Sequence, residues 1–403
     1  MSTAAPQGSA HAIAGPTRGL DRGQVHAVAA CYFVASFATL GLPPYFTAIL
    51  PGLGDPTARW AGLLYVIPTV FSALGAPFWG RLADRFGRKR LLLRAQLGLS
   101  VSFLFAGAAD SLPAFTAALV LQGFLGGTFA ASNGYLAAGL EGPRLSGALA
   151  LMQGGARASL VAAPIVVGAL SPWIGPHRQY LLMAVLPLAA AALLARLPEP
   201  RLTPAAKPER AGPAPCDRTD GLLRLLYALE FVFVFSTVIS FPYLIALLDQ
   251  RLPGLSPTVA GLLFALPHLC YLLFAARAHN LVLGRARLGF ALGLAVVALG
   301  LAGHAAADSL AAFVTVRLVF GAGLTLGLVS LSVLAAEAAH GRAPGRMFGT
   351  VEFFSKGGAV AAGVVAALVA GRYGASAPAL TGAATALAAA TALLLSRTRR
   401  RFR

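Results

Sequence analysis

The sequence has little charge, few acidic residues and almost no cysteine. Only 11% of its 403 residues are charged, against roughly 25% in ordinary soluble domains. Its 14 Asp and Glu residues stand against 32 Lys and Arg, which gives a formal net charge of +18. This low charge density, with 57% hydrophobic residues, excludes a soluble globular enzyme, a disordered chain and a nucleic-acid-binding module. Three cysteines are too few for a disulfide framework, so we expect all three to be reduced.

The sequence also lacks the motifs that hold metals, cofactors and nucleotides. It contains no zinc-ligand spacing, no phosphate-binding loop, no dinucleotide fingerprint and no pattern typical of a catalytic triad. We therefore expect no enzyme activity, no cofactor, no metal and no ATP hydrolysis by this chain alone. Residues 1–24 lack the compact apolar segment of a secretory signal and are expected to form a cytoplasmic tail.

Long apolar runs make up most of the chain. A helix needs about 20 apolar residues to cross about 30 Å of hydrocarbon at about 1.5 Å per residue. Twelve segments meet this requirement, so the predicted fold class is an all-α integral membrane protein. The predicted spans are 25–50, 60–79, 91–109, 112–139, 147–171, 179–195, 222–248, 257–276, 288–307, 309–336, 347–371 and 376–396.

The basic residues predict the direction in which these spans run. If both termini are cytoplasmic, 24 Lys and Arg lie in cytoplasmic segments and four lie in the loops outside. The four outside are Arg59, Arg178, Arg251 and Arg372. Because cytoplasmic loops carry an excess of Lys and Arg, this distribution predicts cytoplasmic termini. The positive charge is thereby assigned to the anionic membrane surface.

The chain repeats itself at an offset of 198 or 199 residues. The matching segments are Pro44-Tyr45 with Pro242-Tyr243, Asp110-Ser111-Leu112 with Asp308-Ser309-Leu310, Gly123 with Gly321, Ala61-Gly62-Leu63-Leu64 with Ala260-Gly261-Leu262-Leu263, and Pro68 with Pro267. Six spans per repeat is an even number, so the halves share one orientation and form a parallel repeat. We expect two six-helix bundles, 25–195 and 222–396, a Pro-rich cytoplasmic linker, 196–221, and a basic tail, 397–403.

One loop carries a specific pattern. Between spans two and three the chain reads Gly80-Arg81-Leu82-Ala83-Asp84-Arg85-Phe86-Gly87-Arg88-Lys89-Arg90. This resembles, nearly position for position, the loop signature of the major facilitator superfamily. Gly80 and Gly87 would permit a tight reversal, and Asp84 would cap the start of span three. The resemblance implies that Gly80, Asp84, Arg85, Gly87 and Arg88 latch the two halves on the cytoplasmic side. The alternative is a basic loop that only sets topology.

Span five refines the resemblance. It carries Gly155, Pro164 and Gly168 on a face rich in small residues. This is similar to the antiporter signature of drug and metabolite exporters, although Ala163 stands where the family usually has glycine. The alternative is the ordinary packing of small residues between membrane helices.

Span four matches part of another pattern of the same superfamily. It carries Gln122-Gly123, but Leu119 stands where the family has an arginine associated with proton coupling. Arg317 occupies the corresponding place in the second half. The resemblance therefore implies a role for Arg317 in proton coupling, through pairing with Glu352 or support of the site, and Gln122 is a candidate for substrate binding.

Two cations lie deep in the predicted spans. A charge there costs at least ~2.5 kcal/mol on insertion scales, so a charged residue within a span is a candidate for a functional role. Arg157 lies ten residues into span five, and Lys356 lies about as deep in span eleven. The repeat brings them within one residue of equivalence, so we expect a cationic clamp for an anionic substrate near the midplane. The alternative is structural, because Glu352 precedes Lys356 by four residues and would neutralise it.

Few acids and few polar aromatic residues lie within the spans. Glu230 and Glu352 are the candidate proton carriers, because a low-dielectric medium favours the protonated form of a carboxylate. For Glu230 the alternative is a hydrogen bond that packs helices. Tyr45 and Tyr243 are candidates for lining an amphipathic substrate cavity, and simple packing is the alternative for each.

Together these features predict a secondary active transporter that works by alternating access in a bacterial-type inner membrane. The resemblance favours a proton-coupled exporter of a small anionic or zwitterionic molecule, such as a siderophore, metabolite or drug. The alternatives are a proton-coupled importer of an organic anion and, from another class, a transporter-like receptor or sensor. The expected partners are the small-molecule substrate, protons and the lipid bilayer, with no nucleic acid, and the protein is expected to be a monomer.

Overall fold

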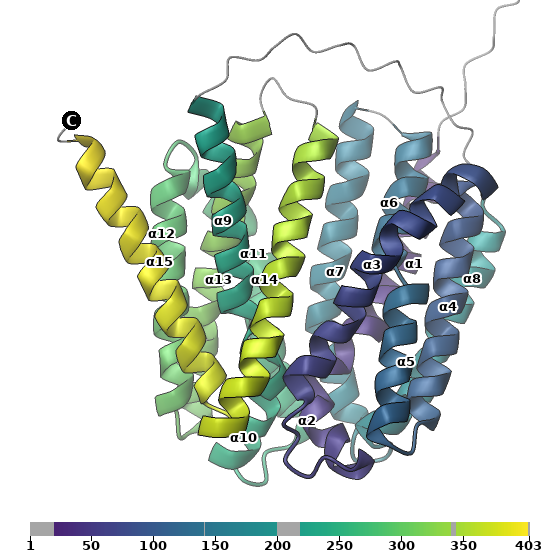
Figure 1. Ribbon diagram of the computed structural model, residues 1–403, viewed down its shortest axis with the longest axis horizontal. Coiled ribbons are helices and arrows are strands. Elements are labelled where there is room, and N and C mark those ends of the chain that lie inside the picture. Colours follow the sequence, from purple (N-terminus) through teal and green to yellow (C-terminus); the bar gives the residue numbers. More distant parts are fainter. Residues whose placement is uncertain (1–19, 141, 200–217, 340–343, 402–403) are drawn as a thin grey trace, which may run out of the picture.

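The computed structural model describes residues 20–140, 142–199, 218–339 and 344–401, and within these ranges the chain forms helices and no strand. The helices stand in two groups (Figure 1). The first group is α1 (Arg22–Gly41), η1 (Pro43–Tyr45), α2 (Phe46–Ile49), η2 (Leu50–Leu53), α3 (Ala61–Phe86), α4 (Arg88–Ala108), α5 (Leu112–Leu125), α6 (Thr128–Gly139), α7 (Gly142–Leu170) and α8 (Pro176–Ala195). The second group is α9 (Arg218–Val238), η3 (Phe241–Tyr243), α10 (Leu244–Arg251), α11 (Pro257–Val282), α12 (Ala286–Ala306), α13 (Leu310–Ala339), α14 (Pro344–Tyr373) and α15 (Ala377–Arg401).

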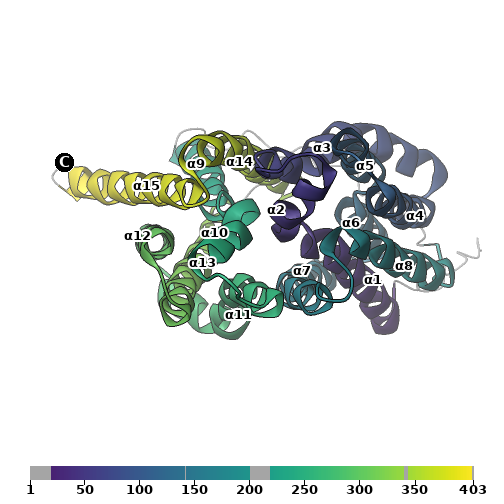
Figure 2. The same ribbon diagram turned by 90° about the horizontal axis from the view of Figure 1, so that it is seen from below.

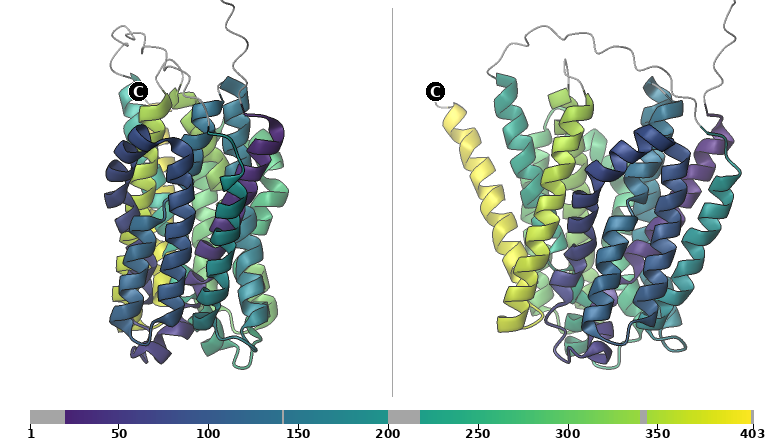
Figure 3. Two further views of the ribbon diagram at one scale, coloured as in Figure 1. Left: turned by 90° about the vertical axis from the view of Figure 1, so that its right-hand side faces the viewer. Right: turned by 45° about the vertical axis from the view of Figure 1, so that its right-hand side comes forward.

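Twelve segments of the described chain are long and apolar enough to cross a membrane, and they coincide with the twelve predicted spans to within a few residues. The long helices run along one common direction (Figure 3). The helix α15 continues to Arg401, through most of the residues that the sequence assigns to the basic tail at 397–403. Most of the predicted linker and of the N-terminal tail lies outside the described residues.

Spans one and seven each break before their ends. Span one passes from α1 through η1, α2 and η2, and span seven passes from α9 through η3 to α10. Proline lacks the N–H that an interior helical turn needs, so Pro44 and Pro242 end the long helices at equivalent places. We call the end of the molecule that carries α2 and α10 the distal end, and the end where α15 finishes the terminal end.

The internal repeat is visible in the packing. A Cβ atom added to Gly123 would lie 2.5 Å from the carbonyl oxygen of Pro68, and one added to Gly321 would lie 2.9 Å from the Cα atom of Pro267. Each glycine therefore lets its helix contact the proline of the helix two spans earlier. The same close contact in both halves confirms the repeat that the offset of 198 or 199 residues predicts.

The halves meet along two helix pairs, α7 with α11 and α3 with α14, which are seen from below in Figure 2. A cluster of buried side chains from both halves fills the distal end, among them Leu42, Phe46, Phe241 and Phe264. This cluster closes the distal end of the interface and leaves the candidate site deeper in the bundle.

Candidate functional site

A cavity of about 380 Å³ lies in the bundle and is lined mainly by the first half. Its walls come from α1, α3, α4, α5, α6, α7 and α14. The lining residues from the first half include Tyr32, Gln122 and Phe129, and the second half supplies Glu352 and Lys356. A cavity of this size, with an aromatic and polar lining, suits a small organic molecule.

Lys356 and Glu352 form an ion pair at the edge of this cavity. Lys356 Nζ lies 3.5 Å from Glu352 Oε1, one helical turn away on α14. The two side chains are 36% and 48% exposed, so each remains accessible from the cavity. The pairing that the sequence offers as the structural alternative for Lys356 is therefore present, and both residues also line the cavity.

Arg157 and Glu230 approach the interface from opposite halves. The guanidinium carbon of Arg157 on α7 lies 5.4 Å from the ring centroid of Tyr271 on α11, a cation–π contact between the halves. Glu230 on α9 lies within electrostatic range of Arg157, and the Ser355 hydroxyl is placed to donate to its carboxylate. Among the described residues, neither Arg157 nor Glu230 forms an ion pair within 4.0 Å.

The predicted cationic clamp is only partly assembled. Lys356 lines the cavity, whereas Arg157 is not among its lining residues. Tyr32 lines the cavity and interacts electrostatically with both Arg157 and Glu352. Tyr32 is therefore the cavity residue that interacts with Arg157, which does not itself line the cavity.

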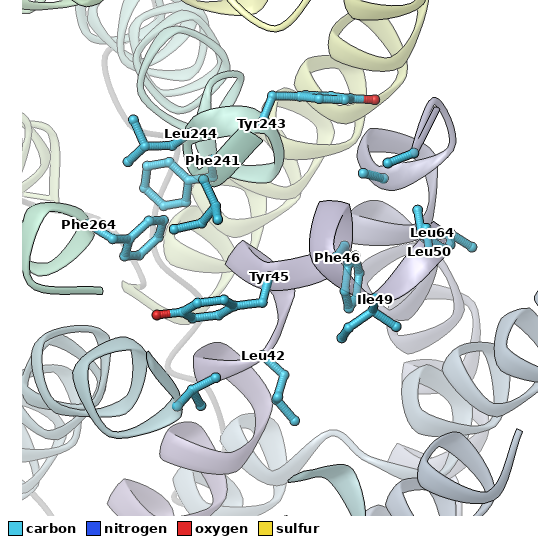
Figure 4. Close-up of a cluster of buried hydrophobic side chains, with 14 of the residues drawn as sticks. Leu42, Tyr45, Phe46, Ile49, Leu50, Leu64, Phe241, Tyr243, Leu244 and Phe264 are labelled. Carbon is cyan, nitrogen blue, oxygen red and sulfur yellow. The ribbon is translucent and has the colours of Figure 1, made fainter. Parts of the chain in front are cut away.

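The two predicted cavity tyrosines are not in the cavity. Tyr45 and Tyr243 are 2% and 4% exposed and belong to the distal cluster. In Figure 4 they point in opposite directions, each away from its own half. The Tyr45 hydroxyl lies 2.7 Å from the Pro164 carbonyl and 3.3 Å from the Pro257 carbonyl. In this state they cannot contact a substrate in the cavity.

Tyr243 also bonds across the interface. Its hydroxyl donates to the Arg59 carbonyl at 2.9 Å and accepts from the Gly62 N–H at 3.1 Å. Both partners belong to the first half, so each tyrosine ties its own half to the other. Tyr243 therefore ties the two halves through both of its hydrogen bonds, whereas Tyr45 does so only through its 3.3 Å contact with Pro257.

Arg317 does not pair with Glu352. It is fully buried, and it donates to the carbonyls of Leu263 at 2.8 Å and Phe264 at 2.7 Å on α11. Pro267 lies four residues after Leu263 and has no N–H to occupy that carbonyl. Arg317 therefore satisfies the backbone of a proline-containing helix, which is the physical reason that the predicted pairing is absent.

The loop signature is arranged differently from the expectation. Gly80 and Asp84 both lie within α3, so Gly80 makes no reversal, and the side chain of Asp84 lies outside the described part of the structure. The turn occurs at Gly87, with φ +98°, and Arg88 begins α4. The backbone N–H of Lys89 donates to Glu199 Oε1 at 3.1 Å, so the first turn of α4 is capped by Glu199 instead. Arg85 is stacked 5.3 Å from the Phe86 ring.

The antiporter-like face of span five is part of the contact between halves. A Cβ atom on Gly168 would lie 2.2 Å from the Pro257 carbonyl oxygen, and Pro164 accepts the Tyr45 hydroxyl. A Cβ atom on Gly155 would lie 3.8 Å from the Phe33 side chain, so close packing there does not require glycine. Gly168 and Pro164 thus belong to the distal closure between α7 and α11.

Sequence reasoning missed a break in span four. The predicted continuous helix 112–139 divides into α5 and α6 at Gly126 and Gly127, and Gly127 has φ +78°. Two side chains satisfy the carbonyls that the break frees. Trp79 Nε1 donates to Phe124 at 2.7 Å, and Arg94 donates to Leu125. The available signal was the glycine-rich run Gly123-Phe124-Leu125-Gly126-Gly127.

Comparison with known sequences agrees with this architecture. The sequence model of the Major Facilitator Superfamily matches residues 28–253. Multidrug resistance protein MdtG of Serratia proteamaculans (strain 568) is 33% identical over 148 residues, 36% of this chain and 36% of that protein. MdtG of Erwinia billingiae (strain Eb661) is 40% identical over 111 residues, 27% of each chain. The chain thus spans only about a third of the length of these curated relatives.

Solved structures match nearly the whole chain. The POT family transporter PepTSo has a TM-score of 0.73 at 15% identity, covering 95% of this chain and 99% of that one. The human organic anion transporter MFSD10 has a TM-score of 0.66 at 21% identity, covering 92% and 98%. At these identities the likeness shows the fold. The family match extends over more than half of the chain, and the twelve spans, the parallel repeat and the loop signature agree with it, so this protein belongs to the Major Facilitator Superfamily of membrane transporters.

Proposed function

We propose that this protein is a proton-coupled exporter of a small zwitterionic or anionic organic molecule. The observation that carries the proposal is that Arg157 and Glu230 approach the interface from opposite halves and, in the part of the chain that the structure describes, form no ion pair within 4.0 Å. A charged side chain within the membrane is costly unless a group of opposite charge pairs with it. A substrate with a carboxylate and an ammonium group can pair with both, the carboxylate with Arg157 and the ammonium group with Glu230. A guanidinium suits a carboxylate because it donates two parallel hydrogen bonds.

Proton coupling through Glu230 follows from competition. A proton and the ammonium group of a substrate both require the Glu230 carboxylate, so only one of them is bound at a time. Exclusive binding of proton and substrate gives antiport, since the transporter returns across the membrane with one or the other. Under this proposal Glu230 exchanges the substrate for a proton at each turn of the cycle.

The direction of transport is supported by the relatives and by charge. The relatives that match the chain are named multidrug resistance proteins. The excess of basic residues on one side favours cytoplasmic termini, so the terminal end would face the cytoplasm of an inner membrane. The distal closure would then face outward, and the cavity would load from the cytoplasm.

A matched pair of dyes tests this proposal. Rhodamine 110 is zwitterionic, and rhodamine 123 is its methyl ester, which is cationic. Proteoliposomes are loaded with rhodamine 110, and efflux is followed with either the outside or the lumen acidified, with protein-free liposomes as the control for leakage. Antiport predicts faster efflux when the outside is acidic, and Glu230→Gln should remove that acceleration. An acceleration that survives in Glu230→Gln would place the proton site elsewhere.

The Glu352–Lys356 pair favours a second candidate function. An anion that takes the place of Glu352 on Lys356 binds well only when Glu352 is protonated. Proton and substrate would then travel together, as in an importer of an organic anion. The same liposomes distinguish the two, because symport predicts faster efflux when the lumen is acidic and loss of that effect in Glu352→Gln.

A further inference from the structure

The two helix pairs that join the halves are related by the repeat, residue for residue. They lie on opposite sides of the interface, α3 with α14 and α11 with α7 (Figure 2). A Cβ atom on Gly62 would lie 2.5 Å from the Gly363 carbonyl oxygen. One on Gly261 would lie 2.2 Å from the Pro164 carbonyl oxygen. Gly62 and Gly261 are 199 residues apart, and so are their two partners, so this offset also relates the side chains that face each other further along each pair.

The same offset relates a covered cation to an uncovered one. Arg157 on α7 is equivalent to Lys356 on α14, and both lie seven residues from the close contact of their own helix pair. Tyr271 on α11 is equivalent to Ser72 on α3. The Tyr271 ring covers Arg157, with its centroid 5.4 Å from the guanidinium carbon. A serine has no ring, so α3 offers Lys356 no such cover at this position.

The cavity lies where that ring is missing. Ser72 and Lys356 both line it, whereas Tyr271 does not. The Lys356 side chain is 36% exposed, so its pair with Glu352 leaves part of it open to the cavity. Thr69, three residues before Ser72 on the same helix face, lines the cavity as well and stands where the second half has a histidine. Two small hydroxyl side chains in place of an imidazole and a phenol leave room for a ring beside Lys356.

We infer that this space is a subsite for an aromatic ring of the substrate, which takes beside Lys356 the place that the Tyr271 ring takes beside Arg157. A cation over the face of an aromatic ring is attracted by the negative potential of that face, and the attraction grows where water is excluded. Pro68, one turn before Ser72, also lines the cavity and offers an apolar surface to the same ring. This inference rests on the proposed function, because it adds an aromatic group to the exported zwitterion, whose two charges have partners of their own.

Two competitors that differ only in their ring test the subsite. Nε-benzoyl-lysine and Nε-cyclohexanecarbonyl-lysine are zwitterions of similar size, and only the first is aromatic. Each is titrated against Nε-dansyl-lysine, a fluorescent zwitterion, bound to the purified protein in detergent. We expect the benzoyl compound to bind roughly fivefold more tightly, as for one cation–π contact. The saturated ring buries at least as much apolar surface, so hydrophobic burial alone predicts no preference for the benzoyl compound.

Variants of Lys356 separate its charge from its shape. Lys356→Met keeps an unbranched stem and removes the charge, so the preference for the benzoyl compound should disappear. Lys356→Arg keeps a cation and should keep the preference. Both competitors carry the same charges, so the changed field of the site cancels in the ratio of their affinities. A preference that survives in Lys356→Met would overturn the inference, and so would the absence of a preference in the wild type.

A variant of Ser72 tests the space itself. Ser72→Tyr copies the second half and should fill the subsite, so we expect both competitors to bind roughly tenfold more weakly and without preference. Ser72→Ala keeps the space and should bind both as the wild type does. Unchanged affinities in Ser72→Tyr would contradict the subsite. If the wild type binds none of the three lysine derivatives, the proposed zwitterionic substrate fails and this inference fails with it. If it binds them without preference, only the aromatic subsite fails.

Discussion

Removing the Tyr243 hydroxyl should open the distal end. Tyr243→Phe deletes two hydrogen bonds that cross between the halves, to Arg59 and from Gly62. A net value of about 1 kcal/mol for each bond gives about 2 kcal/mol, or a shift of roughly thirtyfold toward the state with the distal end open. Tyr45→Phe deletes only one bond between halves, at 3.3 Å, so we expect a shift of about twofold.

The assay is a distance measurement across the distal end. Spin labels at Gly52→Cys and Gln250→Cys, both exposed and on opposite halves, report the opening by pulsed electron resonance. Cys216→Ser removes a reactive background, while Cys31 and Cys270 are buried.

Tyr135→Phe is the matched control, because it loses a 2.7 Å bond to the Pro198 carbonyl that does not join the halves. A distance distribution for Tyr243→Phe that equals those of the wild type and of Tyr135→Phe would refute the reasoning.

Three more outcomes follow from the structure. Arg157→Ala should weaken rhodamine 110 binding in calorimetry by about 2–5 kcal/mol, as for truncation of a buried charge pair, and Arg157→Lys should weaken it less; an unchanged affinity would make Arg157 structural. Arg317→Met leaves the Leu263 carbonyl on α11 without a donor, because Pro267 has no N–H, and should lower the free energy of unfolding by about 1–3 kcal/mol; an unshifted thermal transition would contradict this. Asp84→Asn should slow turnover at equal membrane abundance without lowering thermal stability, because Glu199 caps the first turn of α4. Normal transport rates would mean that Asp84 is not part of the contact that latches the two halves.

The spans and the repeat could be predicted because they depend on local composition. A run of about 20 apolar residues has no stable alternative to a membrane helix. Gly123 and Pro68 match Gly321 and Pro267 because the same close helix contact is built twice. Such contacts leave a trace in the sequence at a fixed offset.

The break in span four could not be predicted with the same certainty. In the sequence, Gly126 and Gly127 cannot be distinguished from glycines that only permit close packing between helices. Whether the helix opens there depends on Trp79 and Arg94, which satisfy the freed carbonyls from other helices. That information is not local, although three glycines within five residues mark the place.

The contacts of single side chains could not be predicted where the partners come from distant segments. Tyr45 is a residue type that often lines substrate cavities, but its hydroxyl contacts the carbonyls of Pro164 and Pro257. The contact with Pro257 connects it to the second half. Arg317 was matched to a proton-coupling position, yet the carbonyl left free by Pro267 determines its contacts. The first turn of α4 is capped by Glu199, which follows the sixth span and is 110 residues from Lys89 in the sequence.

Proton movement driven by substrate tests the central claim most directly. Proteoliposomes loaded with rhodamine 110 are diluted into weakly buffered medium with no initial pH difference and with the membrane voltage clamped by potassium and valinomycin, and a pH electrode records the medium. The account predicts that the medium becomes alkaline as dye leaves, because protons enter in exchange, and that Glu230→Gln abolishes this change. Acidification of the medium in step with dye efflux would mean that proton and substrate travel together, and it would contradict the account.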